Sequence, residues 1–271
     1  MQYRGHAARD QIGRFKVDLI DLAFSELALA GVDVLQRAVW REGDGPQALH
    51  SALKAIEIDP DYGRAHAYVG FFYGFNLFAQ WINPDDDEIA HRARTAIERA
   101  LAFDRGDPFI LQRASMTYLL LGEPETALRY AEVAAAESAR DSEMLTIHGM
   151  TLAYCGDHTN GRAMIEHAVT LERRLSPSIY LSLFEVRHMM QDYAGSLSVL
   201  QMMPDPPHYM RLYEAASLAR LGRIDEARRL LELAPVGFDI ARFAKSQART
   251  CALAQDAEHW LESFRLAGVA V

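Results

Sequence analysis

Small side chains recur along this sequence at a fixed interval, and this repeat constrains the fold more than any other feature. Ala100, Ala134 and Ala168 follow one another at intervals of 34 residues. A small residue also stands seven positions before each of them, at Ala93, Ala127 and Gly161. A period of this length is typical of proteins built by stacking one supersecondary unit many times. The sequence therefore predicts a serial stack of similar units.

The same pattern continues in both directions from this central part. It is found upstream in Ala48, Ala52 and Ala55, and downstream in Ala227, Leu231 and Ala234. The 45 residues between Ala55 and Ala100 exceed the period of 34, which predicts an 11-residue insertion near residues 74–88. Glycines fall where the two helices of a unit should turn, at Gly43, Gly122, Gly156 and Gly222.

These positions match the signature of the tetratricopeptide repeat (TPR), and the chain resembles that family over about residues 29–240. The resemblance implies an all-α fold, a right-handed α-α superhelix of helix hairpins with helical caps. We expect six repeats, starting near Leu29, Gly63, Pro108, Ser142, Ser176 and His208. The repeat over 176–207 is degenerate, because Leu183 stands where a small residue is expected and Gln191 replaces the turn glycine.

The small residues have a packing role in this interpretation. A helix of one hairpin cannot bury its apolar stripe alone, so neighbouring helices must approach closely. The residues expected to permit this approach are Gly70, Ala100, Ala134, Gly149, Ala168, Ala227 and Ala234. A larger side chain at such a position should overpack the stack.

Both ends of the chain are expected to differ from the repeats. Residues 1–28 are predicted to form a tail and an N-terminal capping helix, because apolar residues follow a helical spacing there. Residues 241–271 are predicted to form C-terminal helices that cover the exposed face of the last repeat.

The C-terminal region carries a narrower resemblance. Residues 218–243 and 256–268 are similar to the C-terminal TPR regions of bacterial class III adenylate or guanylate cyclases and of winged-helix regulators. That resemblance implies a sensing or docking module. We find neither the metal-binding aspartates of a cyclase nor a basic recognition helix before residue 29, so it covers the repeat array alone.

Charge and hydropathy exclude two classes of partner. The formal net charge of −9 is unfavourable for contacts with phosphates, so no nucleic-acid partner is expected. Apolar runs fall well short of the roughly 20 residues that span a bilayer, and no signal peptide precedes the repeats. We therefore expect a cytoplasmic protein without a membrane partner.

Residues with chemical potential are present but form no recognisable site. His148, His158 and His167 fall in one repeat, but their positions do not predict convergence on one ion. The only cysteines, Cys155 and Cys251, are isolated, and no glycine-rich phosphate-binding loop occurs. The sequence thus predicts no metal, no cofactor and no catalytic residue.

Function in this architecture is expected on the concave face, where the first helix of each hairpin points inward. The candidate residues for binding a peptide or helix there are Arg37, Phe71, Gln112, Met116, Met150, Tyr180, Phe184 and Arg187. They differ from the Lys/Asn/Arg set with which some TPR proteins clamp a C-terminal carboxylate, so that mode is not expected.

Three functional hypotheses follow, in descending order. The first is a non-catalytic scaffold that binds a protein or peptide partner in its concave groove. The second is a regulatory or sensor module of a cyclase or transcription-regulator system, acting in trans or as a separated domain. The third is an enzyme of unknown type. Contacts through either cap leave a homodimer open.

Overall fold

The computed structural model describes residues 44–82, 85–138, 140–203, 206 and 209–271, and this part of the chain contains helices and no strands. Thirteen helices are described: α2 (Asp44–Ile58), α3 (Gly63–Ala79), α4 (Asp86–Phe103), α5 (Pro108–Leu120), α6 (Pro124–Glu137), α7 (Ser142–Tyr154), α8 (His158–Leu171), α9 (Pro177–Met189), α10 (Tyr193–Met202), α11 (Met210–Arg220), α12 (Ile224–Leu231), α13 (Ile240–Arg249) and α14 (Ala254–Leu266). The capping helix predicted within 1–28, Arg37 and Gly43 lie outside the described residues.

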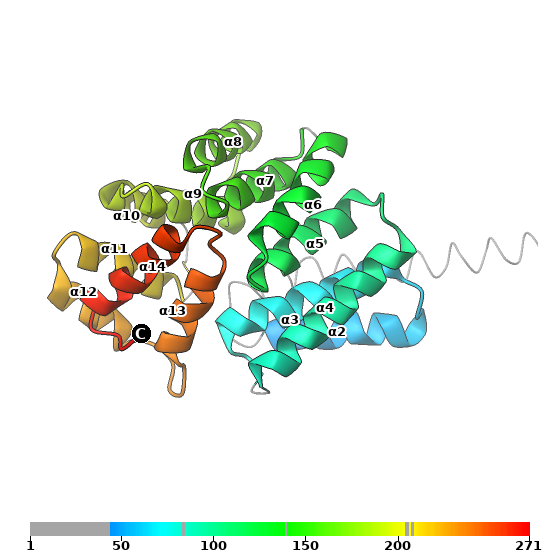
Figure 1. The fold of residues 1–271 in the computed structure, drawn as a ribbon, viewed down its shortest axis with the longest axis horizontal. Coiled ribbons are helices and arrows are strands. Elements are labelled where there is room, and N and C mark those ends of the chain that lie inside the picture. The colour runs from blue at the N-terminus through cyan, green and yellow to red at the C-terminus, as the bar shows by residue number, and fades with distance from the viewer. Residues whose placement is uncertain (1–43, 83–84, 139, 204–205, 207–208) are drawn as a thin grey trace, which may run out of the picture.

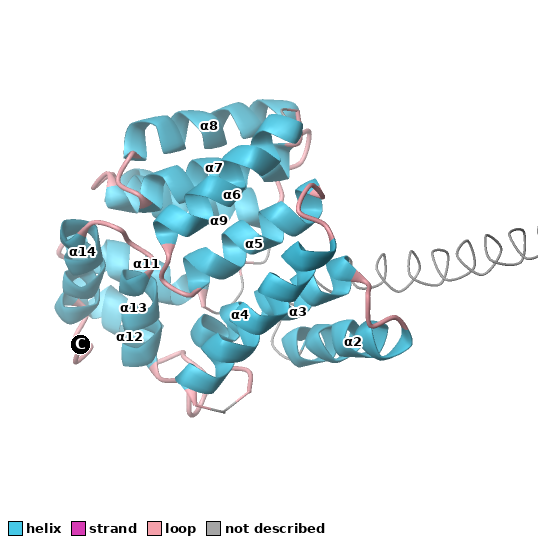
Figure 2. Ribbon diagram, turned by 45° about the vertical axis from the view of Figure 1, so that its right-hand side comes forward, coloured by secondary structure: helices cyan, strands magenta, loops and turns pink. Residues whose placement is uncertain are grey.

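Consecutive helices pair as hairpins, and the hairpins stack in chain order. The pairs are α3 with α4, α5 with α6, α7 with α8, α9 with α10, and α11 with α12. The first helices of neighbouring pairs also contact one another, α3 with α5, α5 with α7, and α7 with α9. Figures 1 and 2 show this succession of hairpins as a continuous curved array. The predicted all-α architecture is confirmed.

The turns inside the hairpins follow the sequence prediction. Gly122, Gly156 and Gly222 adopt left-handed backbone conformations, with φ of 80°, 95° and 77°. Gln191 adopts the same conformation, with φ of 63°, in the hairpin where glycine is missing. The degenerate repeat therefore keeps the turn geometry, at the steric cost that a side chain carries in this region of conformational space.

Two glycines lie where the helices of a hairpin come closest. A Cβ atom at Gly149 would lie 2.6 Å from the carbonyl oxygen of Gly161, and one at Gly70 would lie 3.1 Å from that of Ala93. The alanines expected at such contacts are buried in the same way, with exposed fractions of at most 2% at Ala100, Ala134, Ala168 and Ala227. Ala234 differs, because α12 ends at Leu231 and Ala234 lies half-buried in the following turn.

The extra residues of the second repeat lengthen both of its helices. α3 has 17 residues and α4 has 18, against 13 in α5 and 14 in α6. The remaining extra residues lie in the connection between α3 and α4. The backbone N–H of Ile82 in this connection donates to the side-chain oxygen of Asn76 in α3 at 2.8 Å, and the Asn76 amide donates to the Ile82 carbonyl at 3.1 Å. Trp81 packs there against Phe75, with ring centroids 5.3 Å apart, and against Gly45.

The C-terminal helices do more than cover the last repeat. α14 packs on α11, but α13 also reaches back to α3. Ser246 donates a hydrogen bond to the Leu77 carbonyl at 3.2 Å, and Gln80 exchanges two bonds with the Asp239 backbone at 2.8 and 2.9 Å. Arg242 pairs with Asp86 of α4. Helices far apart in sequence are thus joined, and Figure 1 shows α13 lying between α14 and α3.

Candidate functional site

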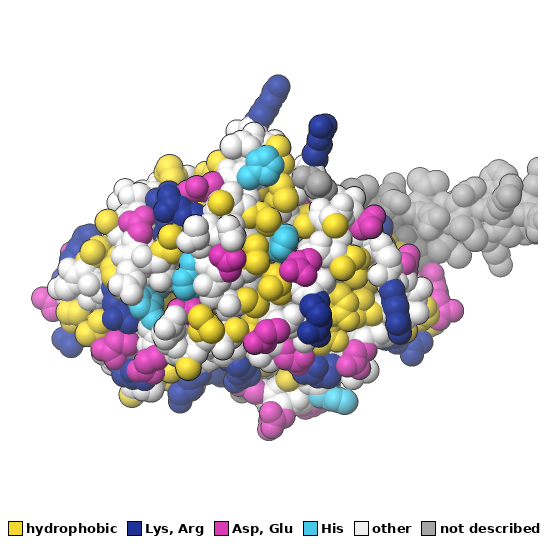
Figure 3. All heavy atoms as spheres, turned by 45° about the horizontal axis from the view of Figure 1, so that its top comes forward, with side chains coloured by type: hydrophobic (Ala, Val, Ile, Leu, Met, Phe, Trp, Pro, Cys, Tyr) yellow, Lys and Arg dark blue, Asp and Glu magenta, His cyan; other side chains and the backbone are white. Residues whose placement is uncertain are grey.

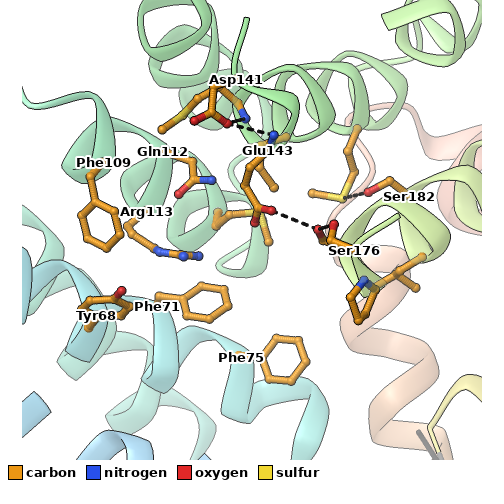
Figure 4. Close-up of a pocket in the computed structure, with 17 residues that line it drawn as sticks. Tyr68, Phe71, Phe75, Phe109, Gln112, Arg113, Asp141, Glu143, Ser176 and Ser182 are labelled. Carbon is orange, nitrogen blue, oxygen red and sulfur yellow. Dashed lines mark hydrogen bonds between the residues drawn. The ribbon is translucent and has the colours of Figure 1, made fainter. Parts of the chain in front are cut away.

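A pocket of about 340 Å³ lies where the first helices α3, α5, α7 and α9 meet (Figure 4). We call it the interhelical pocket. Its size is at the lower end of the range of small-molecule and peptide side-chain sites. Most of its lining is apolar, and a few polar side chains from different helices converge on it.

One wall of the pocket is aromatic and holds an arginine. The Arg113 guanidinium carbon lies 4.9 Å from the centroid of Phe71, 5.2 Å from Phe109 and 5.5 Å from Tyr68. These ring faces attract the cation and exclude water from one side of it. Arg113 forms no ion pair with any described residue, and its Nε atom is buried without a hydrogen-bond partner. Burial also raises the pKa of the Tyr68 phenol, an effect that the nearby Arg113 charge opposes.

Gln112 contributes a second polar group. Its side chain is 2% exposed and points into the pocket (Figure 4). The carboxamide has no hydrogen-bond partner among the described residues, although it carries two donors and an acceptor. The amide atoms are not among the fully buried ones that lack a partner, so they are open to the space of the pocket.

The opposite wall is acidic and comes from the start of α7. Asp141 caps this helix by accepting from the backbone N–H groups of Glu143 and Met144, at 2.9 and 3.1 Å. The Glu143 carboxylate accepts a hydrogen bond from Ser178 of α9 at 3.2 Å. Two carboxylates thus face the pocket on this side, while Arg113 faces it on the other (Figure 4).

The structure brings together half of the eight residues predicted for partner binding. Phe71, Gln112, Met116 and Met150 line the interhelical pocket. Tyr180, Phe184 and Arg187 do not line the pocket.

Those remaining residues lie on other faces of α9. Phe184 is fully buried and packs on Tyr213, with ring centroids 5.8 Å apart. Tyr180 is half-buried against the core, and Arg187 turns toward α10, where it donates to the Gly195 carbonyl at 3.3 Å. Their side chains are therefore placed in packing positions rather than in the pocket.

Sequence reasoning missed Tyr68, Phe75, Arg113 and Leu181, all of which line the pocket. The inward positions expected for the helix over 63–79 are Arg64, Ala67 and Phe71, the first two of which are three residues apart. Because a helix has 3.6 residues per turn, a step of four was equally available, and it leads to Tyr68 instead of the fully buried Ala67. Tyr68, Arg113 and Leu181 each stand one position after an expected inward residue, and this neighbouring row is the signal that could have found them.

Beyond the pocket, the inner face is filled by the C-terminal helices. Glu185 of α9 is buried among Tyr154, Tyr213 and Gln247, and Tyr213 donates a hydrogen bond to Gln247 at 2.8 Å. Burial raises the pKa of the Glu185 carboxyl to about 7, and hydrogen bonds from the three neighbours oppose the shift.

A second buried cluster surrounds His188. Its Nδ1 and Nε2 atoms bond Ser217 at 2.8 Å and Ser263 at 3.1 Å, and its ring stacks on Trp260 at 4.1 Å. Burial holds the pKa of His188 well below its ordinary value. With 0% exposure, this Ser–His contact is inaccessible to a substrate and serves packing.

The three histidines considered as metal ligands are separated. His158 lies 3.0 Å from Asp256 of α14, His167 is exposed, and burial lowers the pKa of His148. Burial raises the pKa of Cys155 to about 11 and that of Cys251 to about 12, so neither thiol is activated. Among the described residues no group of three or more His, Cys, Asp or Glu could hold a metal ion.

The surface shown in Figure 3 carries acidic and basic side chains in alternation, without a large area of one sign. Such a face offers no continuous basic track for phosphates. No helix in the described part of the chain has the length and apolar character needed to cross a bilayer.

Comparisons with known proteins assign the fold. A crystal structure of a thermophilic TPR protein from Thermus thermophilus aligns with 67% of this chain and 98% of its own, at a TM-score of 0.52 and 21% identity. Pseudomonas aeruginosa PilF (84% of this chain, 98% of its own, 19% identity) and a tetratricopeptide repeat protein from Parabacteroides merdae (91%, 92%, 18%) align at TM-scores of 0.47, too low to add to the assignment. No family model and no curated protein matches the sequence.

The fold is therefore a TPR α-α solenoid, as the sequence predicts. Identity at this level defines the architecture alone. The residues of the interhelical pocket are therefore the basis for inferring what the chain binds.

Proposed function

We propose that this chain is a non-catalytic TPR scaffold that binds a segment of a partner protein in the interhelical pocket. The main support for this function is the pocket, because the first helices of the hairpins form it and solenoids present their binding surface there. Its apolar lining with few convergent polar groups is typical of a recognition site. His188 is fully buried, and burial raises the pKa of the Cys155 and Cys251 thiols, so these groups lack the access or the activation that a catalytic role requires.

The methionines of the pocket supply an experiment with a matched control. Met116 lines the pocket and is half-buried, whereas Met202 at the end of α10 is 59% exposed and lies outside it. Met116→Glu should abolish capture of the partner from native lysate, because a buried carboxylate next to a bound apolar side chain is unfavourable. Met202→Glu should leave capture unchanged.

Circular dichroism and thermal melting of both variants separate loss of binding from loss of folding. Equal capture by wild type and Met116→Glu, with both folded, would refute the pocket as the partner site. No captured protein from any native source would refute the scaffold function.

The regulatory hypothesis remains a proposal that rests on the sequence resemblance of residues 218–243 to cyclase-linked and winged-helix TPR regions. The contact of α13 with α3 gives such a module a joint that binding could open or close. A cyclase or winged-helix protein recovered as the captured partner would support it. A cytoplasmic location and a homodimer likewise stay proposals, tested by fractionation and by sedimentation.

A further inference from the structure

The polar groups of the interhelical pocket define the chemistry of its occupant. Gln112 is 2% exposed, points into the pocket and has no hydrogen-bond partner among the described residues. Because its carboxamide both donates and accepts, a purely apolar ligand leaves it unpaired. One peptide unit of an extended segment, with its N–H and C=O, satisfies both functions together.

Arg113 sets a second requirement. Its guanidinium lies over three rings and interacts with the Tyr68 hydroxyl, its Nε has no hydrogen-bond partner, and it takes part in none of the ion pairs of the described residues. Glu143 lines the same pocket but accepts from Ser178 instead. A cation kept partly dry by aromatic rings binds a carboxylate more strongly than one in free solvent does.

The remaining lining is adaptable and apolar. Phe75, Met116, Ile147 and Met150 contribute it, and methionine side chains adjust to aliphatic groups of different shape. The volume of about 340 Å³ accommodates a short segment and is small for a long helix. Glu143 and Asp141 disfavour a second carboxylate on the α7 side.

We propose that the pocket binds an extended peptide segment whose backbone pairs with Gln112, whose acidic side chain pairs with Arg113, and whose neighbouring aliphatic side chain enters the apolar part. This inference rests on the proposed function and names the class of partner. The acid lies on the Arg113 side of the pocket, away from Glu143 and Asp141, and we assign it to a side chain of the segment.

The test uses random heptapeptides displayed on phage, selected separately on wild type and on Arg113→Glu. Wild type should enrich peptides with Asp or Glu beside an aliphatic residue. Arg113→Glu should enrich Lys or Arg at the position that the acid occupied. Arg113→Met, which keeps the apolar stem on the rings, should lose the acidic preference and serves if the charge reversal fails to fold.

The backbone contact is measured on a peptide from the wild-type selection, acetylated and amidated at its ends, by fluorescence anisotropy. Gln112→Leu should weaken its binding about tenfold or more. Methylation of the peptide nitrogen that Gln112 contacts should weaken wild type strongly and Gln112→Leu little. Each variant is first checked for wild-type helicity and melting temperature.

Three results would overturn the inference. They are enrichment of the same peptides by wild type and Arg113→Glu, unchanged affinity of Gln112→Leu, or binding that requires a free terminal carboxylate. If partner capture depends on Met116 but on neither Gln112 nor Arg113, the scaffold function stands and this assignment of partner chemistry fails.

Discussion

The inner face of the solenoid is built from equivalent helices along its length, yet its two halves differ in what covers them. Where α13 and α14 lie against the first helices, Phe243 and Trp260 are fully buried and fill the space. Between α3, α5, α7 and α9 no described residue supplies such a cover, and a pocket remains. We refer to these as the covered half and the open half.

The two halves also differ in the hydrogen bonding of their buried glutamine and histidine side chains. In the covered half both ring nitrogens of His188 and the amide of Gln247 are hydrogen-bonded, whereas the indole nitrogen of Trp260 and the Nε of Arg242 have no partner. In the open half the Nε of Arg113 is buried without a partner, and the amide of Gln112, which no hydrogen bond of the described residues includes, faces the pocket. Unpaired buried atoms thus occur in both halves, and what distinguishes the open half is that Gln112 and Arg113 line a pocket that a ligand can enter.

Removing the aromatic filling of the covered half should have the largest effect. Trp260→Ala deletes a fully buried ring that stacks on His188 at 4.1 Å. We expect a loss of about 3–5 kcal/mol in the free energy of unfolding, measured in urea, because the cavity cannot collapse between two packed helices. Leu266→Ala on the same helix, 38% exposed, is the matched control and should cost much less. Similar losses in both variants would contradict the description of α14 as core.

The second largest effect is expected in the pH dependence of stability, which the buried Glu185 of the covered half should control. The pKa of Glu185 is raised to about 7 by burial, against 4.5 for an exposed glutamate. Between these values the folded chain holds a proton that the unfolded chain has lost, so stability falls as pH rises from about 4.5 to about 7 and stays reduced above.

Glu185→Gln removes this dependence. At pH 8 the variant should be more stable than wild type by up to about 3 kcal/mol, the free-energy equivalent of the pKa difference at about 1.4 kcal/mol per unit. Near pH 4.5 this advantage should vanish. His188, whose depressed pKa lowers stability as pH falls below its ordinary value, is common to both proteins and cancels in the difference. A difference constant from pH 5 to pH 8 would contradict the prediction.

Sequence reasoning reached the fold because its signal is local and repeated. Ala100, Ala134 and Ala168 report the same helix contact three times, and the turn glycines report the same backbone conformation. Errors in one repeat are corrected by its neighbours. The turn at Gln191 was recoverable from the period even though its residue type argued against it.

The site was only partly accessible by the same route. Adjacent residues of a helix point in directions about 100° apart around its axis. This single step separates Tyr68, which lines the pocket, from Ala67, which lies in the core. Phe184 has the spacing of a groove residue, but it is fully buried and packs on Tyr213 of α11, with ring centroids 5.8 Å apart. The period carries no information on that long-range contact, so Phe184 could not be separated from Phe71 before the structure was known.

One substitution made at two equivalent residues sharpens the comparison further, although its effects are smaller. Gln112 in the open half and Gln247 in the covered half are both almost fully buried, with exposed fractions of 2% and 1%. Gln247→Leu removes the acceptor of the Tyr213 hydroxyl and the donor to the Tyr154 hydroxyl, and should destabilise the chain by about 1–3 kcal/mol, since it breaks buried hydrogen bonds. Gln112→Leu removes a group that has no partner in the described chain, so it should leave the free energy of unfolding unchanged or raise it by about 1 kcal/mol. Urea denaturation of the two variants measures both values in the absence of any ligand. Losses of equal size would mean that Gln112 is satisfied within the protein itself, and the open half would then have no unmet requirement for a peptide.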